Sequence, residues 1–167
     1  MDSSGKDNFE VERQFFVSFI PEGLLKYNPC YKLKQGYLAI EDKREVRIRA
    51  KQENFSLTVK TGDGIKRTER EIELTPDDFT WLWPLTKGRR IVKTRYNIPF
   101  EQYTIELDIY EENLSGFVSA EVEFPSESES NEFIPPEWFG KEVTWDSRFK
   151  NKNIVLKGIP EDIDGLR

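Results

Sequence analysis

Near its N-terminus the chain reads Phe9-Glu10-Val11-Glu12-Arg13-Gln14-Phe15, in which polar side chains recur at every second position, as they do in a β-strand. On an extended strand Glu10, Glu12 and Gln14 share one face, and the residues between them share the other. Neighbouring carboxylates repel each other and need a cation, a metal ion or open water. Taken alone, the pattern is typical of an amphipathic strand with a solvated acidic face, but it returns in five further stretches.

The composition indicates one folded and very polar domain. Of the 167 residues, 34% are charged, 37% hydrophobic and 13% aromatic, and this aromatic content is too high for a disordered chain. We expect a single domain over residues 9–157, with flexible tails at 1–8 and 158–167. The net charge of −6 argues against a nucleic acid polymer as a partner.

Two reactive residue types are absent or nearly so. The sequence has no histidine, which excludes a Ser-His-Asp triad, a Cys-His pair and a histidine-built zinc site. Any metal ion must therefore bind oxygen ligands, as Mg²⁺, Mn²⁺ and Ca²⁺ do. Cys30 is the only cysteine, no apolar run is long enough to span a membrane, and the start does not resemble a signal peptide. We therefore expect a cytoplasmic protein with no membrane partner.

The pattern of side chains predicts a mainly β protein. Strands are expected at 9–15, 35–40, 45–50, 55–60, 68–74, 91–97, 102–110 and 116–124. Thr61-Gly62-Asp63-Gly64 has the chemistry of a hairpin turn. Thr75 can cap a helix that begins at Pro76 and runs to about Leu82. A second helix is expected over 125–133 and a short one after Pro21.

Charged residues share one face on most of the expected strands. The bases are Arg47, Arg49, Lys60, Lys93 and Arg95, and the acids beyond the first strand are Glu69, Glu71, Glu73, Glu106, Asp108, Glu121 and Glu123. An open sheet would keep this charged face in water. A closed barrel would enclose it, with the bases facing a polyanion and the acids holding the accompanying metal ions. The spacing alone does not decide between the two architectures.

Ten segments follow one another in a familiar order. They are Glu10-Val11-Glu12-Arg13-Gln14-Phe15, Gln35-Gly36-Tyr37-Leu38, Val46-Arg47-Ile48-Arg49, Leu57-Thr58-Val59-Lys60, Arg70-Glu71-Ile72-Glu73, Trp83-Pro84-Leu85-Thr86-Lys87-Gly88-Arg89-Arg90, Lys93-Thr94-Arg95-Tyr96, Glu106-Leu107-Asp108, Glu121-Val122-Glu123-Phe124 and Arg148-Phe149-Lys150-Asn151. From about Glu10 to about Leu156 the chain resembles the CYTH, or triphosphate tunnel metalloenzyme, superfamily. Within it, the chain is most similar to the short bacterial inorganic tripolyphosphatases.

The resemblance implies an eight-stranded antiparallel closed β-barrel, with helices packed outside it and the helix around Phe79 to Trp83 plugging the tunnel. It implies that Mg²⁺ or Mn²⁺ is held by Glu10, Glu12, Asp108, Glu121 and Glu123. It implies that triphosphate oxygens are bound by Arg47, Arg49, Lys60, Lys93 and Arg95. It also implies that Tyr37 and Lys93 assist catalysis and that the protein is a homodimer. Because there is no histidine, Glu71 or Glu73 is the candidate to orient the attacking water.

The chain departs from the family pattern at one position of the opening motif. The family has Glu-x-Glu-x-Lys there, and this chain has Gln14 where the lysine belongs. Glutamine can bind a phosphate oxygen but carries no charge, which removes about 1–3 kcal/mol of charge-assisted contact. Arg13 is expected on the opposite face of the strand and cannot simply replace the lysine.

The leading hypothesis is a metal-dependent hydrolase that converts inorganic tripolyphosphate to pyrophosphate and phosphate. A class IV adenylate cyclase and a thiamine triphosphatase are alternatives that share the same tunnel. A non-catalytic phosphate or nucleotide sensor is a third alternative, which the presence of Gln14 motivates. The basic segment from Arg148 to Lys152 is interpreted either as a cover over the tunnel mouth or as a surface feature.

Overall fold

The computed structural model describes residues 11–63 and 66–162, and within these ranges eight strands form one antiparallel sheet. The strands lie side by side in the order β1-β8-β7-β6-β2-β3-β4-β5. Their bounds are β1 Val11–Phe16, β2 Cys30–Ile40, β3 Arg44–Lys51, β4 Asn54–Asp63, β5 Lys66–Leu74, β6 Arg90–Phe100, β7 Tyr103–Tyr110 and β8 Val118–Phe124. The mainly β prediction is thus confirmed, and each expected strand is present.

Short helices connect or follow the strands. They are α1 Pro76–Leu82, η1 Trp83–Thr86, η2 Glu112–Leu114, α2 Glu127–Glu132, η3 Ser147–Phe149 and α3 Asn151–Lys157. The predicted cap is confirmed at α1, where the Thr75 hydroxyl accepts from the backbone N–H of Asp78 and the Asp78 side chain bonds back.

Some predicted boundaries differ from the structure. β2 begins at Cys30, five residues before the expected start at Gln35, because it extends to pair with β6. β4 continues to Asp63 through the expected turn, and the connection at 64–65 lies outside the described residues. The segment after Pro21 forms turns rather than a helix.

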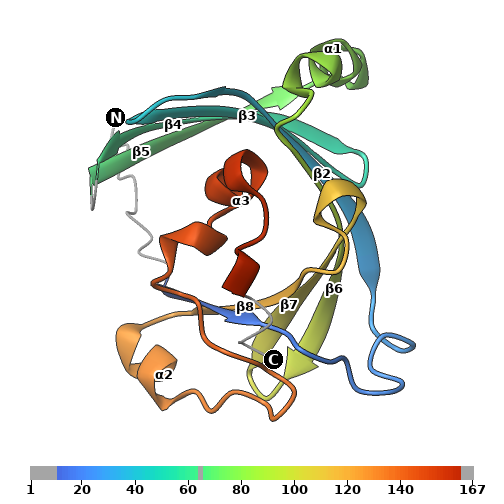
Figure 1. The fold of residues 1–167 in the computed structure, drawn as a ribbon, viewed down its shortest axis with the longest axis vertical. Helices are drawn as coiled ribbons and strands as arrows, with labels where there is room; N and C mark the ends of the chain where they lie inside the picture. The colour runs from blue at the N-terminus through green and yellow to red at the C-terminus, as the bar shows by residue number, and fades with distance from the viewer. Residues whose placement is uncertain (1–10, 64–65, 163–167) are drawn as a thin grey trace, which may run out of the picture.

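The predicted closed barrel is not confirmed. The sheet curls strongly, so that it wraps around α3 (Figure 1). Within the described residues β5 is paired with β4 alone. β1 is paired with β8, and its outer edge bonds to the segment 140–144 through an isolated bridge between Phe15 and Glu142. No ladder joins β1 to β5 there. The hydrogen bonding therefore describes a curled sheet with two edges, and the charged face is its concave face.

The convex face carries apolar side chains from alternate strand positions. Helix α1 covers one part of it, where Phe79 packs with Ile48 and Ala50 of β3. The expectation that this helix plugs the tunnel is wrong, because its apolar side faces the apolar face of β3, which points away from Arg47 and Arg49. In Figure 1, α1 lies outside the curl of the sheet.

Helix α3 takes the place inside the curl that was expected for α1. Ile154 of α3 and the neighbouring Phe149 are buried against Phe16, Tyr110 and Phe117. This apolar cluster fills one end of the concave side and leaves polar residues at the other. No helix in the described part of the chain is long and apolar enough to cross a membrane.

Candidate functional site

The strand register brings the predicted acids onto the concave face. Glu12 pairs with Glu123, and Gln14 with Glu121, across β1 and β8. Glu121 pairs in turn with Glu106 of β7. Directly paired residues of antiparallel strands point to the same side of a sheet. The acids therefore form a continuous patch, and only Glu10 of the predicted set lies outside the described residues.

The same register places the predicted bases on this face. On β6, Arg95 pairs with Asp108 and Lys93 with Tyr110. On β3, Arg49 pairs with Gln35 and Arg47 with Tyr37, while Glu45 of β3 pairs with Lys60 of β4. The period of two in the sequence thus correctly predicted which side chains share a face.

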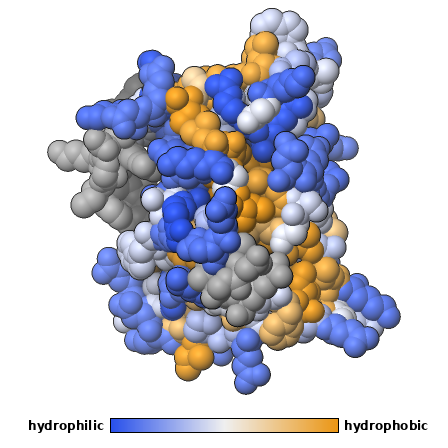
Figure 2. Space-filling model, in the orientation of Figure 1, coloured by the Kyte–Doolittle hydropathy of each residue, from blue (hydrophilic) through white to orange (hydrophobic). Residues whose placement is uncertain are grey.

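A cavity of about 230 Å³ opens between the acidic and basic parts of the concave face. Its walls from the sheet are Glu12, Gln14, Tyr37, Glu45, Arg47, Lys60 and Glu121, and its remaining wall is the segment from Phe149 to Lys152. Figure 2 shows hydrophilic residues over much of the visible surface, with a band of hydrophobic residues running between them.

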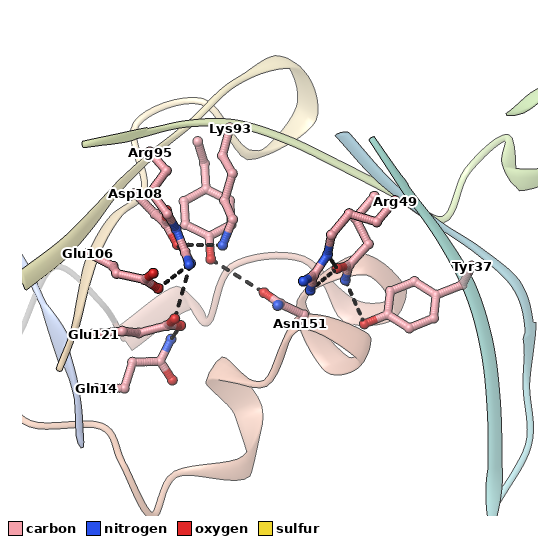
Figure 3. A network of polar contacts seen from close by, with 11 residues as sticks. Gln14, Tyr37, Arg49, Lys93, Arg95, Glu106, Asp108, Glu121 and Asn151 are labelled. Carbon is pink, nitrogen blue, oxygen red and sulfur yellow. Dashed lines mark hydrogen bonds and ion pairs between the residues drawn. The ribbon is translucent and has the colours of Figure 1, made fainter. Parts of the chain in front are cut away.

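A buried ion network lies beside the acidic wall. Asp108, which is fully buried, accepts from the Lys93 ammonium and from the Arg95 Nε at 2.7 Å. Arg95 also bonds Glu106, and its Nη2 lies 3.2 Å from Glu121 (Figure 3). Burial opposes the charge on Asp108, but Lys93 and Arg95 hold the pKa of its carboxyl below the usual range. Both oxygens of Asp108 are thus engaged by cations.

Two other carboxylates of the concave face, Glu12 and Glu121, have pKa values above the usual range. Partial desolvation on the concave face, followed by repulsion from Glu121 and Glu123, raises the pKa of Glu12 to about 7, although part of the side chain is exposed. Burial also raises the pKa of Glu121, despite the attraction of Lys93. The Gln14 amide donates to Glu121 at 3.4 Å, a long contact that brings no charge.

The carboxylate oxygens of this acidic patch are the type of ligand that a hard divalent cation binds. Mg²⁺ and Mn²⁺ prefer carboxylate oxygens, and a cation would relieve the repulsion that raises the pKa of Glu12. Among the described residues, however, no group of three or more acids, cysteines or histidines forms a ready-made metal site. The predicted ligand Glu10 lies outside those residues, and Asp108 is bound to Lys93 and Arg95.

The basic wall contains a donor with no partner. The Nε of Arg47 is buried and lacks a hydrogen bond within the described structure. Beside it, Arg49 donates to the Gln35 side-chain oxygen at 2.8 and 3.1 Å, and the Gln35 amide donates to the Tyr37 hydroxyl at 3.2 Å. Burial raises the pKa of Tyr37. An unpaired buried guanidinium donor is costly, and an anionic oxygen in the cavity would satisfy it.

The two carboxylates predicted to orient water lie farther out. Glu71 and Glu73 are exposed on the edge strand β5, on its concave face by register. Glu71 accepts from the Thr58 hydroxyl at 3.3 Å. Neither residue lines the cavity, so the structure does not bring them to its walls.

The sequence reasoning left open the segment that closes the cavity. Phe149 is fully buried, and the Asn151 side-chain oxygen accepts from the Tyr110 hydroxyl at 3.4 Å. Lys152 forms an ion pair of 2.9 Å with Glu45. Figure 3 shows Asn151 lying between the network around Arg95 and the group around Arg49. Phe149 lies within the basic run from Arg148 to Lys152. An aromatic side chain at such a position indicated that the run packs against the protein, because a buried aromatic residue anchors the charged residues on either side of it.

Comparisons with known proteins agree with this architecture. No family model matches the sequence. The chain is 44% identical over 150 residues to an inorganic triphosphatase of Nitrosomonas europaea, covering 88% of this chain and 97% of that protein. It is 34% identical to an inorganic triphosphatase of Acetivibrio thermocellus, covering 87% and 92% of the two chains.

A solved structure shows the same fold. The crystal structure of an inorganic triphosphatase superposes with a TM-score of 0.74 at 40% identity, covering 90% of this chain and 96% of that chain. Both the sequence and the fold of this chain thus match these proteins over nearly their full length. The chain belongs to the inorganic triphosphatase family, in agreement with the CYTH resemblance of its sequence.

Proposed function

We propose that this protein is a metal-dependent hydrolase that converts inorganic tripolyphosphate to pyrophosphate and phosphate in the concave cavity. The relatives at 44% and 34% identity are inorganic triphosphatases and support this assignment. The observation that carries it is the buried, unpartnered Nε of Arg47 in a cavity that Lys60 also lines. A phosphate oxygen is the ligand that suits a guanidinium fork and an ammonium group together.

The basic residues would bind and orient the polyphosphate. Arg47, Arg49 and Lys60 would take one part of the chain of phosphates. Lys93 and Arg95 would face another part from the acidic side, because Asp108 and Glu121 hold their charged groups in place. Such fixed cations stabilise the charge that develops on the transferring and leaving phosphoryl groups.

The acidic wall would hold the metal ion. We infer that Glu12, Glu121 and Glu123, together with Glu10, hold Mg²⁺ or Mn²⁺ when polyphosphate is bound. Bound metal supplies neutralisation of phosphate charge and polarisation of a phosphoryl oxygen. Glu12 loses its proton near pH 7, so its charge at neutral pH responds to a nearby cation.

A carboxylate would orient the attacking water in line with the leaving pyrophosphate. Glu71 and Glu73 are proposed for this role because both belong to the concave face of β5. Tyr37, which is buried next to the basic wall, would contribute a hydroxyl donor to a phosphate oxygen.

The test is phosphate release from inorganic tripolyphosphate by the wild type, in Mg²⁺, in Mn²⁺ and in a chelator. We expect release that requires the metal and that Glu12→Ala abolishes. Formation of cyclic AMP and pyrophosphate from ATP, without phosphate release from tripolyphosphate, would instead establish a cyclase and contradict the proposal.

A protein that binds tripolyphosphate without hydrolysing it is the second candidate, because Gln14 replaces the positively charged lysine of the family's Glu-x-Glu-x-Lys motif. Tight binding of tripolyphosphate without products would favour it. In that case Gln14→Lys should gain turnover, since it restores the charge that the family motif has at this position.

A further inference from the structure

The polar face of β1 supplies no cation to the cavity. Gln14 lines the cavity, and its side-chain amide donates a hydrogen bond to Glu121 at 3.4 Å. Arg13 points to the opposite face, where it pairs with Glu142 at 2.7 Å and donates to the Ser130 carbonyl at 2.8 Å. Arg13 is thus committed elsewhere, and a phosphate beside Gln14 needs a positive charge from another element.

The segment before α3 brings such a charge to the same cavity. Lys150 immediately precedes α3 and lines the cavity together with Gln14. Its position is fixed on both sides, because Phe149 is fully buried and Asn151 is bonded to Tyr110. The backbone at Lys150 is thus held against the concave face while its side chain remains exposed.

The other lysines at the cavity are already engaged. Lys60 pairs with Glu69 at 2.7 Å, and Lys152 pairs with Glu45 at 2.9 Å. Lys150 forms no ion pair with any residue that the structure describes. A lysine on a long flexible stem acts as a point charge that can follow an anion, and an unpaired one loses no existing contact when it does so.

We propose that Lys150 supplies the phosphate-binding charge that the β1 position of Gln14 lacks in this chain. This inference rests on the proposed function, since the anion is the polyphosphate bound in the cavity. The side chain of Lys150 contacts a phosphate oxygen from the α3 side, and Gln14 contributes only a neutral hydrogen bond from the β1 side. The phosphate-binding charge that the family motif places on β1 is thus supplied in this chain by the segment that precedes α3.

The experiment is a calorimetric titration of inorganic tripolyphosphate in a chelator, which stops turnover. The proteins are the wild type, Lys150→Gln, Gln14→Lys and the double variant. We expect Lys150→Gln to weaken binding about tenfold in the wild type, as loss of one charge-assisted contact does. In the Gln14→Lys background the same substitution should weaken it less than about threefold, because the lysine introduced on β1 then carries the charge.

Two controls separate charge from folding. Lys150→Arg keeps the charge and should bind within about twofold of the wild type. Lys157→Gln removes an exposed lysine from the last turn of the same helix, outside the cavity lining, and should leave affinity unchanged. Thermal unfolding of each variant shows whether its fold is retained.

The inference is overturned if Lys150→Gln binds like the wild type, or if it loses equal affinity in both backgrounds. Equal losses would mean that Lys150 acts independently of position 14. A wild type that neither binds nor hydrolyses tripolyphosphate would overturn the proposed function itself, and the inference with it.

Discussion

The carboxylate of Asp108 lies between the ammonium of Lys93 and the guanidinium of Arg95, with both of its oxygens accepting hydrogen bonds. Asp108 and Lys93 are both buried. The aspartate therefore acts as the counter-ion that holds two cations in place on the concave face. Its own charge is maintained by those cations against the cost of burial.

Asp108→Ala should lower the free energy of unfolding by about 3–5 kcal/mol, because it removes the ion-pair partner of the buried Lys93 and one of the partners of Arg95. Urea denaturation at neutral pH measures this change. Asp146→Ala removes one of the two carboxylate partners of the half-exposed Arg148 and should cost no more than about 1 kcal/mol. Equal losses in the two variants would show that burial of the Asp108 network contributes nothing.

Glu12 should make the metal-free protein less stable as the pH rises. Its pKa is about 7 in the folded protein and 4.5 in the unfolded chain, so the folded state binds more protons between these values. Stability should thus fall from about pH 4.5 to about pH 7. The effect is limited because the side chain remains in contact with solvent.

The comparison of wild type with Glu12→Gln tests this dependence. In chelator, the variant should have the higher melting temperature at pH 8, and its advantage should disappear at pH 4.5. Addition of Mg²⁺ at pH 8 should raise the melting temperature of the wild type more than that of Glu12→Gln. A variant that gains nothing at pH 8 would contradict the repulsion inferred for Glu12.

Arg47→Gln should weaken the binding of tripolyphosphate by about 10- to 100-fold, because it removes a charged group at the cavity whose buried Nε has no hydrogen-bond partner within the described structure. Titration calorimetry in chelator measures the change. Arg44→Gln is the matched control from the same strand, since Arg44 is exposed and pairs with Glu41. Equal affinity of the two variants would exclude Arg47 from the binding site.

Arg13→Gln should reduce stability while leaving affinity for tripolyphosphate unchanged. Arg13 holds Glu142 and the Ser130 carbonyl on the convex side of β1, so its loss should cost about 1.5–3 kcal/mol. Chemical denaturation and calorimetric titration of one preparation separate the two effects. A loss of affinity in a fully folded variant would mean that the two faces of β1 are not independent.

The alternation of side chains allowed much of the site to be predicted. Residues two apart on a strand point the same way whatever its neighbours are, so Glu12 and Gln14 had to share a face, as did Arg47 and Arg49. The cap at Thr75 was equally local, and the helix that it begins was predicted correctly. Conversely, a neutral residue at position 14 was visible in the sequence as a departure from the family motif.

Only the tertiary structure decided which helix covers each face of the sheet and whether the sheet closes into a barrel. Helix α1 carries apolar residues, but its sequence does not say whether they meet the convex or the concave side of β3. The choice depends on where Ile48 and Ala50 point once β3 has found its partners. The same holds for Lys150, whose place at the cavity follows from the burial of Phe149 among residues distant in the chain. Long-range packing of this kind is set by which surfaces bury each other, and no local period of the sequence encodes it.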